Sequence, residues 1–287
     1  MTVRTILVPV RGDGKGEGVL DHALSFARRY SAHLDVVHCR PRPEDLLPFG
    51  ISVPAILKKD ILASAATLAD EEERKVKSQF GEYCANHQLT VIDAPPGPPD
   101  LVTVSWRERT GKQAAIVGLY GRLTDLTAVA QPDRQRNLGL NTLEAALLET
   151  GRLALMCPPK PPGDIGAHVA LGWNGSSEIS RAITAALPIL ESAEAVTLLS
   201  ASESKKGALG PEDGQAYLAS HGIECEIRAM TARTTKTGQA LLAGAKEAGA
   251  DVLLMGAYGQ SRRRELVLGG VTQHIIDYAD LPVLLMH

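Results

Sequence analysis

The chain has 287 residues, of which 44% are hydrophobic and 22% charged, and its formal net charge is −3. This is the composition of an ordinary globular protein, and the length allows one large domain or two of usual size. The small negative charge excludes a broad basic surface for nucleic acid, and no stretch approaches the roughly 20 apolar residues needed to cross a bilayer.

The first pattern along the chain is a βαβ unit over residues 5–39, TILVPVRGDGKGEGVLDHALSFARRYSAHLDVVHC. An apolar run is followed by a polar turn, an amphipathic helix pattern and a second apolar run. The N-terminus enters this strand pattern without a cleavage site, so we expect a cytoplasmic protein. The glycine-rich GDGKGEG at 12–18 lacks the spacing that lets a P-loop lysine reach phosphates, and we do not predict a site there.

The next pattern is a long helix over residues 55–88. Its DEEERK run at 70–75 is interpreted as a solvated helix face rather than an acidic binding site. Two apolar runs then follow, AAIVGLYG at 114–121 and RLALMCP at 152–158. Both are typical of strands in a parallel sheet that is covered on its two faces.

A linker follows at 158–167, PPKPPGDIGA, where four prolines and two glycines cannot continue a helix. The βαβ pattern then repeats over residues 168–201, DVLLMGAYG at 251–259 pairs with 114–121, and LPVLLMH at 281–287 pairs with 152–158. We therefore predict two α/β domains in tandem, residues 1–160 and 165–287, each with a doubly wound parallel sheet. In such sheets ligands bind at the carboxyl ends of the strands, where the strand order reverses.

A glycine pattern follows one of these strands. Gly256 and Gly259 come directly after the apolar run at 252–255, and Gly269 and Gly270 precede a helical pattern that begins with Val271 and Thr272. Glycines allow the backbone to turn sharply and to approach a ligand, while the start of a helix offers unpaired N–H groups to an anion. This spacing indicates a phosphate site.

The pattern G-x2-G-x9-G, followed by a small residue and V-T, resembles the nucleotide loop of universal stress proteins. The resemblance extends over essentially the whole chain, including the ILVPV, GADVLLMG and PVLLM segments. It implies Rossmann-like domains of the adenine nucleotide alpha hydrolase-like type. It also implies a stress-response sensor or regulator that binds ATP, with Mg²⁺, or AMP.

Carried over by position, the binding residues are Asn174 at the end of the first strand of the second copy and a loop at Gly256, Gly259, Gly269, Gly270, Val271 and Thr272. Asn174 stands where the family has an acidic residue, and it lacks the charge that favours a pair of hydroxyls. Gly270 stands where the family has a hydroxyl residue, so one side-chain donor is lost.

The first copy keeps Gly118 and Gly121 but has no glycine pair at the required distance, and Arg11 ends its first strand. We therefore predict that residues 1–160 are a degenerate domain whose nucleotide loop is lost. In the second copy, the run from Ser261 to Glu265 contains three arginines. It either brings cations over a triphosphate or forms a solvated surface loop.

Other chemistry finds little support. The four cysteines have no metal or redox spacing, so no metal site is predicted, and the eight histidines lie in no catalytic motif. Trp173 is interpreted as a core residue rather than a base-stacking one. We predict no catalytic residue and favour a non-enzymatic function. The alternatives are a slow ATPase or nucleotidyl-transfer enzyme, and a nucleotide-free dimerisation scaffold.

The closing strands near 153–156 and 283–286 are apolar edges that invite pairing. In the family that edge supports dimerisation. The resemblance therefore implies that the two copies pair within the chain as a pseudo-dimer, and that whole chains form a homodimer.

Overall fold

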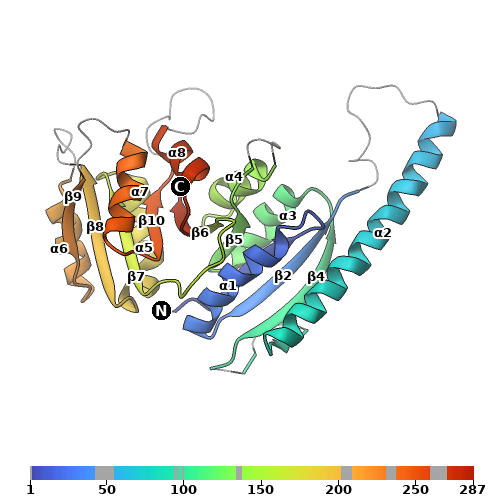
Figure 1. The fold of residues 1–287 in the computed structure, drawn as a ribbon, viewed down its shortest axis with the longest axis horizontal. Coiled ribbons are helices and arrows are strands. Elements are labelled where there is room, and N and C mark those ends of the chain that lie inside the picture. The colour runs from blue at the N-terminus through green and yellow to red at the C-terminus, as the bar shows by residue number, and fades with distance from the viewer. Residues whose placement is uncertain are drawn as a thin grey trace.

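The computed structural model describes residues 2–42, 55–93, 95, 97–98, 100–133, 138–201, 209–230, 237–258 and 270–287. Strands and helices alternate along most of these residues (Figure 1). The strands are β1 (Thr5–Val10), β2 (His33–Arg40), β3 (Thr90–Val91), β4 (Thr103–Thr110), β5 (Leu126–Ala130), β6 (Leu153–Cys157), β7 (His168–Trp173), β8 (Ala195–Ala201), β9 (Glu226–Met230), β10 (Val252–Gly256) and β11 (Val283–Met286). The helices are α1 (Gly16–Tyr30), α2 (Ala55–Asn86), α3 (Gln113–Tyr120), α4 (Leu140–Leu148), α5 (Ser177–Glu191), α6 (Pro211–Ser220), α7 (Thr237–Glu247) and α8 (Gly270–Tyr278), with a 3₁₀ turn at Gly121–Leu123.

The strands form one sheet of 11 strands in the order β3-β4-β2-β1-β5-β6-β11-β10-β7-β8-β9. Apart from β3, the order in the first half mirrors that in the second, and all pairs within each half are parallel. The strand order reverses between β1 and β5, and again between β7 and β10. The predicted α/β fold with a mostly parallel sheet is confirmed.

Helices cover both faces of the sheet. One core packs α1, α2, α5 and α6 against the sheet through residues such as Phe26, Phe80, Ile183 and Leu218. The core on the other face contains residues of α3, α4, α7 and α8. Strand side chains alternate between these layers, as the period of two in a strand requires. This is the doubly wound arrangement that the alternation of strands and helices predicted.

One predicted strand is wrong. Residues 114–121 lie in α3 and the following 3₁₀ turn, and the true counterpart of β10 is β5. A short apolar run of this kind fits a buried helix as well as a strand, because periodicity does not separate them. Ile116 packs against Leu7, Val37 and Cys39, whereas Val117 joins the larger core on this face. The run is apolar because the helix is buried, not because it lies in the sheet.

The closing strands of the two halves pair with each other. β6 and β11 are antiparallel neighbours, with Val283 opposite Met156 and Leu285 opposite Ala154. This confirms the predicted pairing of the two halves within the chain. A homodimer of whole chains stays a prediction, and it would need another surface, since each closing edge already has its partner inside the chain.

Further contacts join the halves. Tyr30 Oη at the end of α1 lies 2.9 Å from Ser192 Oγ, directly after α5. The segment 158–167 connects β6 to β7, and there the side chain of Asp251 accepts hydrogen bonds of 2.7 Å from the N–H groups of Gly166 and His168. Ile165 in the same segment is buried. The C-terminal end of the linker is therefore fixed to the sheet.

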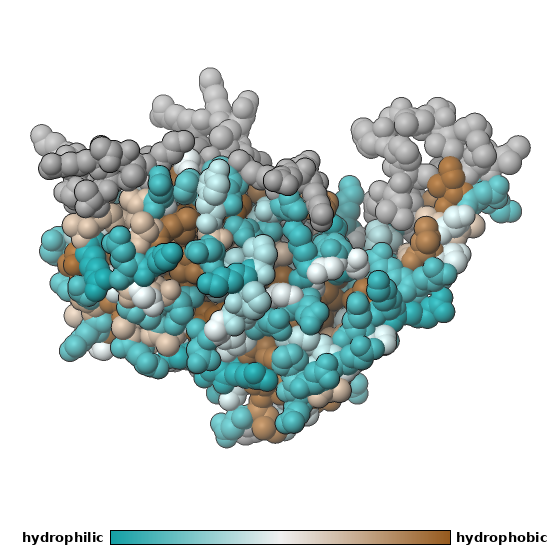
Figure 2. Space-filling model, in the orientation of Figure 1, coloured by the Kyte–Doolittle hydropathy of each residue, from teal (hydrophilic) through white to brown (hydrophobic). Residues whose placement is uncertain are grey.

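The long helix α2 confirms the helix expected near residues 55–88, and one end of it extends beyond the sheet (Figure 1). Figure 2 shows a mainly hydrophilic surface on this face, with hydrophobic side chains in small separate groups. Ile61 and Leu68 of α2 are exposed. No helix in the described ranges is both long and apolar enough to span a membrane.

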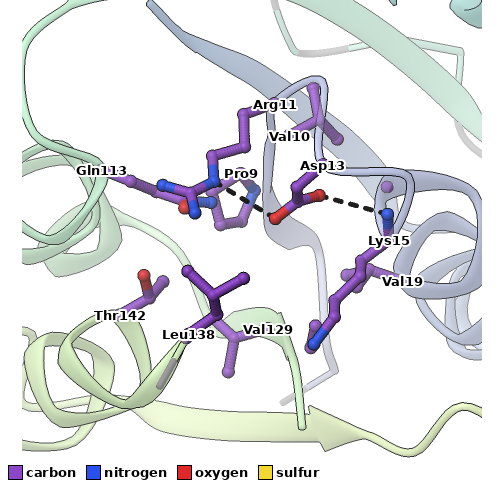
Figure 3. Close-up of a pocket in the computed structure, with 13 residues that line it drawn as sticks. Pro9, Val10, Arg11, Asp13, Lys15, Val19, Gln113, Val129, Leu138 and Thr142 are labelled. Carbon is purple, nitrogen blue, oxygen red and sulfur yellow. Dashed lines mark hydrogen bonds and ion pairs between the residues drawn. The ribbon is translucent and has the colours of Figure 1, made fainter. Parts of the chain in front are cut away.

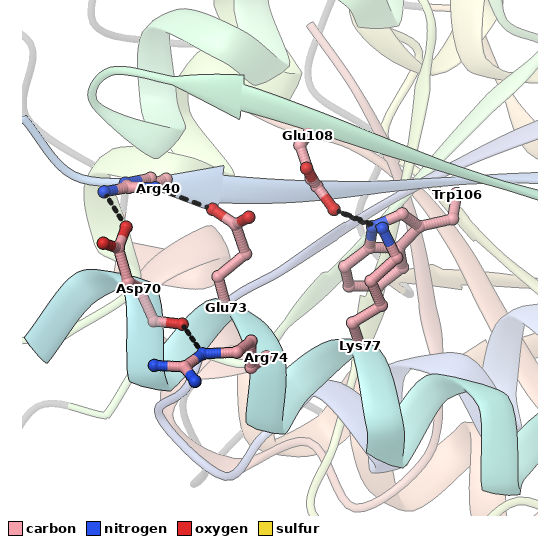
Figure 4. A network of polar contacts seen from close by, with 7 residues as sticks. All are labelled: Arg40, Asp70, Glu73, Arg74, Lys77, Trp106 and Glu108. Atoms are coloured by element: carbon pink, nitrogen blue, oxygen red, sulfur yellow. Dashed lines mark hydrogen bonds and ion pairs between the residues drawn. The ribbon is translucent and has the colours of Figure 1, made fainter. Parts of the chain in front are cut away.

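The acidic run of α2 is more than a solvated face. Arg40, at the end of β2, forms ion pairs with Asp70 and Glu73, the second at 3.0 Å, as Figure 4 shows. Glu72 accepts a hydrogen bond of 2.9 Å from the backbone N–H of Gly12. The run therefore attaches α2 to the ends of β1 and β2, which the helical pattern alone did not predict.

Candidate functional site

The candidate site lies at the carboxyl edge of the second half. β7 and β10 are parallel neighbours there, with Gly172 opposite Met255. Trp173 follows Gly172 in β7, and Gly256 follows Met255 in β10. Asn174 is the first residue after Trp173. Since the strand order reverses between these strands, their carboxyl ends form the place where doubly wound sheets bind ligands. The structure thus brings two predicted site residues, Asn174 and Gly256, to one edge.

Asn174 begins the turn into α5. Its Oδ1 accepts a hydrogen bond of 3.1 Å from the N–H of Ser176, and Gly175 between them has a φ of 66°. Ser176 caps the helix, because its Oγ accepts a hydrogen bond from the N–H of Ile179. Asn174 is exposed, and its Nδ2 donates to no group in the described ranges. A side-chain donor is therefore left for a ligand.

Gly256 is a packing residue. A Cβ atom at this position would lie 2.7 Å from the backbone N of Ile179 and 2.8 Å from the backbone C of Glu178. Such distances are closer than atoms in contact tolerate, so only glycine lets the end of β10 pack against the first turn of α5. Gly256, which the sequence analysis assigned to the nucleotide loop, therefore sets the distance between β10 and α5.

Glu178 supplies a carboxylate at the same edge that sequence reasoning missed. Its side chain is buried, Ser177 Oγ donates to it at 3.1 Å, and Arg181 lies 3.5 Å away. Burial alone raises the pKa of Glu178, but hydrogen bonds from its own backbone N–H and from the Ser176 and Ser177 hydroxyls outweigh burial and lower it. The only sequence signal was an acidic residue in the first turn of a helix.

The start of α8 carries three further predicted site residues. Gly270 is its first residue and is exposed, and a Cβ there would meet no atom of the described residues within 4 Å. Val271 packs partly against the core, and Thr272 is buried. The first turn of this helix therefore has open space beside Gly270, whereas its next residues turn toward the protein.

The remaining predicted site residues, Gly259 and Gly269, lie outside the described residues. The arginine cluster from Ser261 to Glu265 lies outside them as well. Both of its interpretations, cations over a triphosphate or a solvated loop, therefore stay predictions.

The equivalent edge of the first half has a different character. Arg11 follows β1 and forms an ion pair of 3.1 Å with Asp13, which also accepts a hydrogen bond from the N–H of Lys15 (Figure 3). The hollow between β1, β5 and α4 encloses only about 30 Å³, the scale of one water molecule. A hollow of about 520 Å³ adjoins it, over Lys112, Gln113 and the start of α4. The switch point itself is largely filled by side chains.

The glycines assigned to the first-half loop do not lie in it. Gly118 is inside α3 against the side chain of Glu149, and Gly121 packs against Thr150. After β5 the chain continues instead with Gln131, whose amide donates hydrogen bonds to the carbonyls of Ile276 (2.8 Å) and Ala279 (3.2 Å). The position next to β5 therefore binds the end of α8 in the other half.

The structure also shows where the residues lie to which the sequence analysis gave no binding or catalytic role. Trp173 is buried, lies against Gly214 of α6, and donates from Nε1 to the carbonyl of Leu209 at 3.2 Å, so it is a core residue as predicted. His22 and His38 are buried in α1 and β2. Among the described residues, no group of three or more His, Cys, Asp or Glu side chains could hold a metal ion.

Comparison with known proteins places the second half in a family. Residues 178–287 match the model of the Universal stress protein family and form a domain of that family. No curated protein matches the chain. The matched segment begins in α5, so Asn174 lies just before it and Gly256 within it.

Solved structures match over the whole chain. A universal stress protein from Archaeoglobus fulgidus DSM 4304 is 14% identical, with 99% of this chain and 96% of that chain covered and a TM-score of 0.69. A putative universal stress protein from Pseudomonas aeruginosa UCBPP-PA14 is 16% identical, with 99% and 93% covered and a TM-score of 0.53. A functionally unknown protein from Pseudomonas aeruginosa PAO1 is 15% identical, with 99% and 92% covered and a TM-score of 0.55. At these identities the matches establish the fold of the full chain.

Proposed function

We propose that the chain is a tandem universal stress protein whose second half, residues 165–287, binds an adenine nucleotide as a sensor or regulator, while the first half, residues 1–160, does not. The observation that carries the proposal is the junction of β7, β10 and α5. Close packing at Gly256 fixes the end of β10 against α5, and beside it stands Asn174, whose Nδ2 has no acceptor among the described residues. The setting is a domain of the universal stress protein family.

The residues present fit a nucleotide in two respects. Asn174 Nδ2 would donate to a ribose hydroxyl, since its Oδ1 is occupied by the N–H of Ser176. The first turn of α8 would face the phosphates, because its N–H groups carry the positive end of the helix dipole and Gly270 adds no side chain in front of them. ATP would bring Mg²⁺ bound to its own phosphates.

The edge of the first half differs from the proposed nucleotide site of the second half in the residues that would contact the ligand. Arg11 stands at the position of Asn174, so a guanidinium paired with Asp13 replaces the amide that would donate to a ribose hydroxyl. The hydrogen bonds of Gln131 to α8 give the segment after β5 a role in joining the halves. We therefore propose one nucleotide per chain.

The test uses Gly270→Asp in the full chain. Aspartate at the start of a helix stabilises the helix, so the variant is expected to fold, but its charge repels phosphate. Calorimetric titration should show one ATP per chain for the wild type and about tenfold weaker ATP binding for the variant. Adenosine should bind both proteins equally, because it lacks phosphates.

Asn174→Asp is the matched change at the other end of the ligand. Its carboxylate can still accept from the N–H of Ser176, so the turn is kept, and it adds the charge that favours ribose hydroxyls. Adenosine and ATP should both bind more tightly. An absence of binding to ATP and AMP at millimolar concentration would refute the proposal. Product formation over hours, if seen, would support the alternative of a slow ATPase or nucleotidyl-transfer enzyme.

A further inference from the structure

A further hollow lies on the first half, on the other side of Gly111 and Lys112 from the hollow of about 520 Å³. It has a volume of about 500 Å³ and lies between the segment after β2, the end of β4 and the outer side of α3. Figure 1 shows α3 beside the end of β2 at this border of the sheet. Within the described ranges it is lined by Arg42, Arg109, Thr110, Gly111, Lys112, Ala115, Ile116, Leu119 and Tyr120. We call it the Arg42 hollow.

The charged residues that line the described part of the Arg42 hollow are all basic, although the chain as a whole is acidic. Arg42, Arg109 and Lys112 line it, and no carboxylate does among the residues that the structure describes. Within the described ranges, the side chains of Arg42 and Lys112 form no hydrogen bond or ion pair. Three cations around one hollow repel one another unless an anion lies between them. The charge pattern therefore favours an anionic ligand.

Arg109 is held in place by its neighbours. Its Nε donates to Tyr120 Oη at 2.5 Å, its Nη1 donates to the carbonyl of Glu108 at 2.7 Å, and its guanidinium lies 5.2 Å from the centre of the Tyr120 ring. Nη2 has no hydrogen-bond partner among the described residues. A guanidinium fixed in this way loses little side-chain entropy when it binds a further acceptor.

The other wall of the hollow is apolar. Ala115 and Leu119 of α3 are exposed, with Leu119 at 57%, and Ile116 and the Tyr120 ring lie between them and the sheet. A fixed cation beside an exposed leucine suits a ligand with a charged head and an apolar body. A free phosphate or a small sugar would leave this wall without a contact.

We propose that the Arg42 hollow binds one small amphipathic anion, with its carboxylate or phosphate head among Arg42, Arg109 and Lys112 and its apolar body against Leu119. A volume of about 500 Å³ is that of a ligand pocket for a molecule with a medium-length acyl chain or an aromatic ring. The site is separate from the proposed nucleotide crevice, which lies at the other half of the sheet. It would add a second ligand site to the nucleotide site proposed for the other half.

The experiment is calorimetric titration of the full chain with decanoate, decyl phosphate, decanol and inorganic phosphate. Decanoate and decyl phosphate carry the two possible heads, and the tighter one identifies the head group. Both should bind with one molecule per chain and at least about tenfold more tightly than decanol or inorganic phosphate. Decanol binding as well as decanoate, or no binding of either anion at millimolar concentration, would overturn the proposal.

Two pairs of variants locate the site. Lys112→Glu should weaken decanoate binding about tenfold, whereas Lys246→Glu on the exposed face of α7 makes the same charge change elsewhere and should have no effect. Leu119→Asn should weaken binding several-fold, while Leu123→Asn, four residues further on and outside the hollow, should not. Equal effects within either pair would place the ligand elsewhere. Circular dichroism of each variant confirms that it is folded.

Discussion

Replacing Gly256 by alanine should destabilise the protein through backbone overlap. The added Cβ would lie 2.7 Å from the N of Ile179 and 2.8 Å from both the C and the Cβ of Glu178. Two of these three atoms belong to the backbone of the first turn of α5 and cannot rotate away. Overpacking of this kind costs about 1–3 kcal/mol, and we expect a value near the upper end, about 3 kcal/mol.

The assay is thermal and urea unfolding followed by circular dichroism. A loss of about 3 kcal/mol should lower Tm by roughly 6–12 °C. Gly270→Ala is the matched control, because a Cβ there meets nothing within 4 Å in the part of the chain that the structure describes, and its φ is not positive. Alanine at that position should be neutral or should raise stability by about 0.4–1 kcal/mol. A Gly256→Ala variant within about 0.5 kcal/mol of the wild type would refute the packing role of this glycine.

Three further predictions concern the interface, an acidic side chain and the thiols. Gln131→Ala should lower the free energy of unfolding by about 1–3 kcal/mol, since the part-buried carbonyls of Ile276 and Ala279 lose the Gln131 amide as a donor. Glu178 has a lowered pKa, so its contribution to stability is present above its ordinary pKa of 4.5 and is lost as the pH falls through the folded value. Glu178→Gln should therefore be less stable than the wild type at pH 7, and the difference should shrink toward pH 3. A thiol reagent should label Cys225, the partly exposed cysteine, before the buried thiols of Cys39, Cys84 and Cys157.

Each of these has a result that would contradict it. If Gln131→Ala has the same free energy of unfolding as the wild type, water replaces the hydrogen bonds of the Gln131 amide. If the stability difference between Glu178→Gln and the wild type stays constant from pH 7 to pH 3, the Glu178 carboxylate does not contribute to the pH dependence of stability. Labelling of Cys39 at the rate of Cys225 would contradict the burial that raises the pKa of the Cys39 thiol to about 12.

Much of the fold could be predicted because its signals are local. The βαβ pattern at 5–39, its repeat at 168–201 and the closing strands could all be read from alternating apolar and amphipathic runs. The error at 114–121 arose because a short apolar run has no periodicity to separate a strand from a buried helix. The missed strand β5, LTAVA, is short, and one of its five residues is the polar Thr127, which is buried.

The site was predictable in part for a similar reason. The sequence placed Asn174 and Gly256 at the ends of strands, and the topology brings those ends together. The packing of Gly256 on α5, the burial of Glu178 and the use of Gln131 between the halves depend on contacts between distant segments. No spacing along the chain encodes such contacts. The Arg42 hollow likewise joins Arg42 to the distant segment 109–120.

The most direct test of nucleotide binding in the second half is hydrogen–deuterium exchange of the full chain with and without saturating ATP. Binding should slow exchange in peptides that cover residues 172–180 and 252–276, because ordering by the ligand reduces local opening there. Peptides at 9–16 and 126–143, the equivalent edge of the first half, should not change. Protection at the first-half edge, or no protection at either edge, would contradict the proposal that one nucleotide binds at the second.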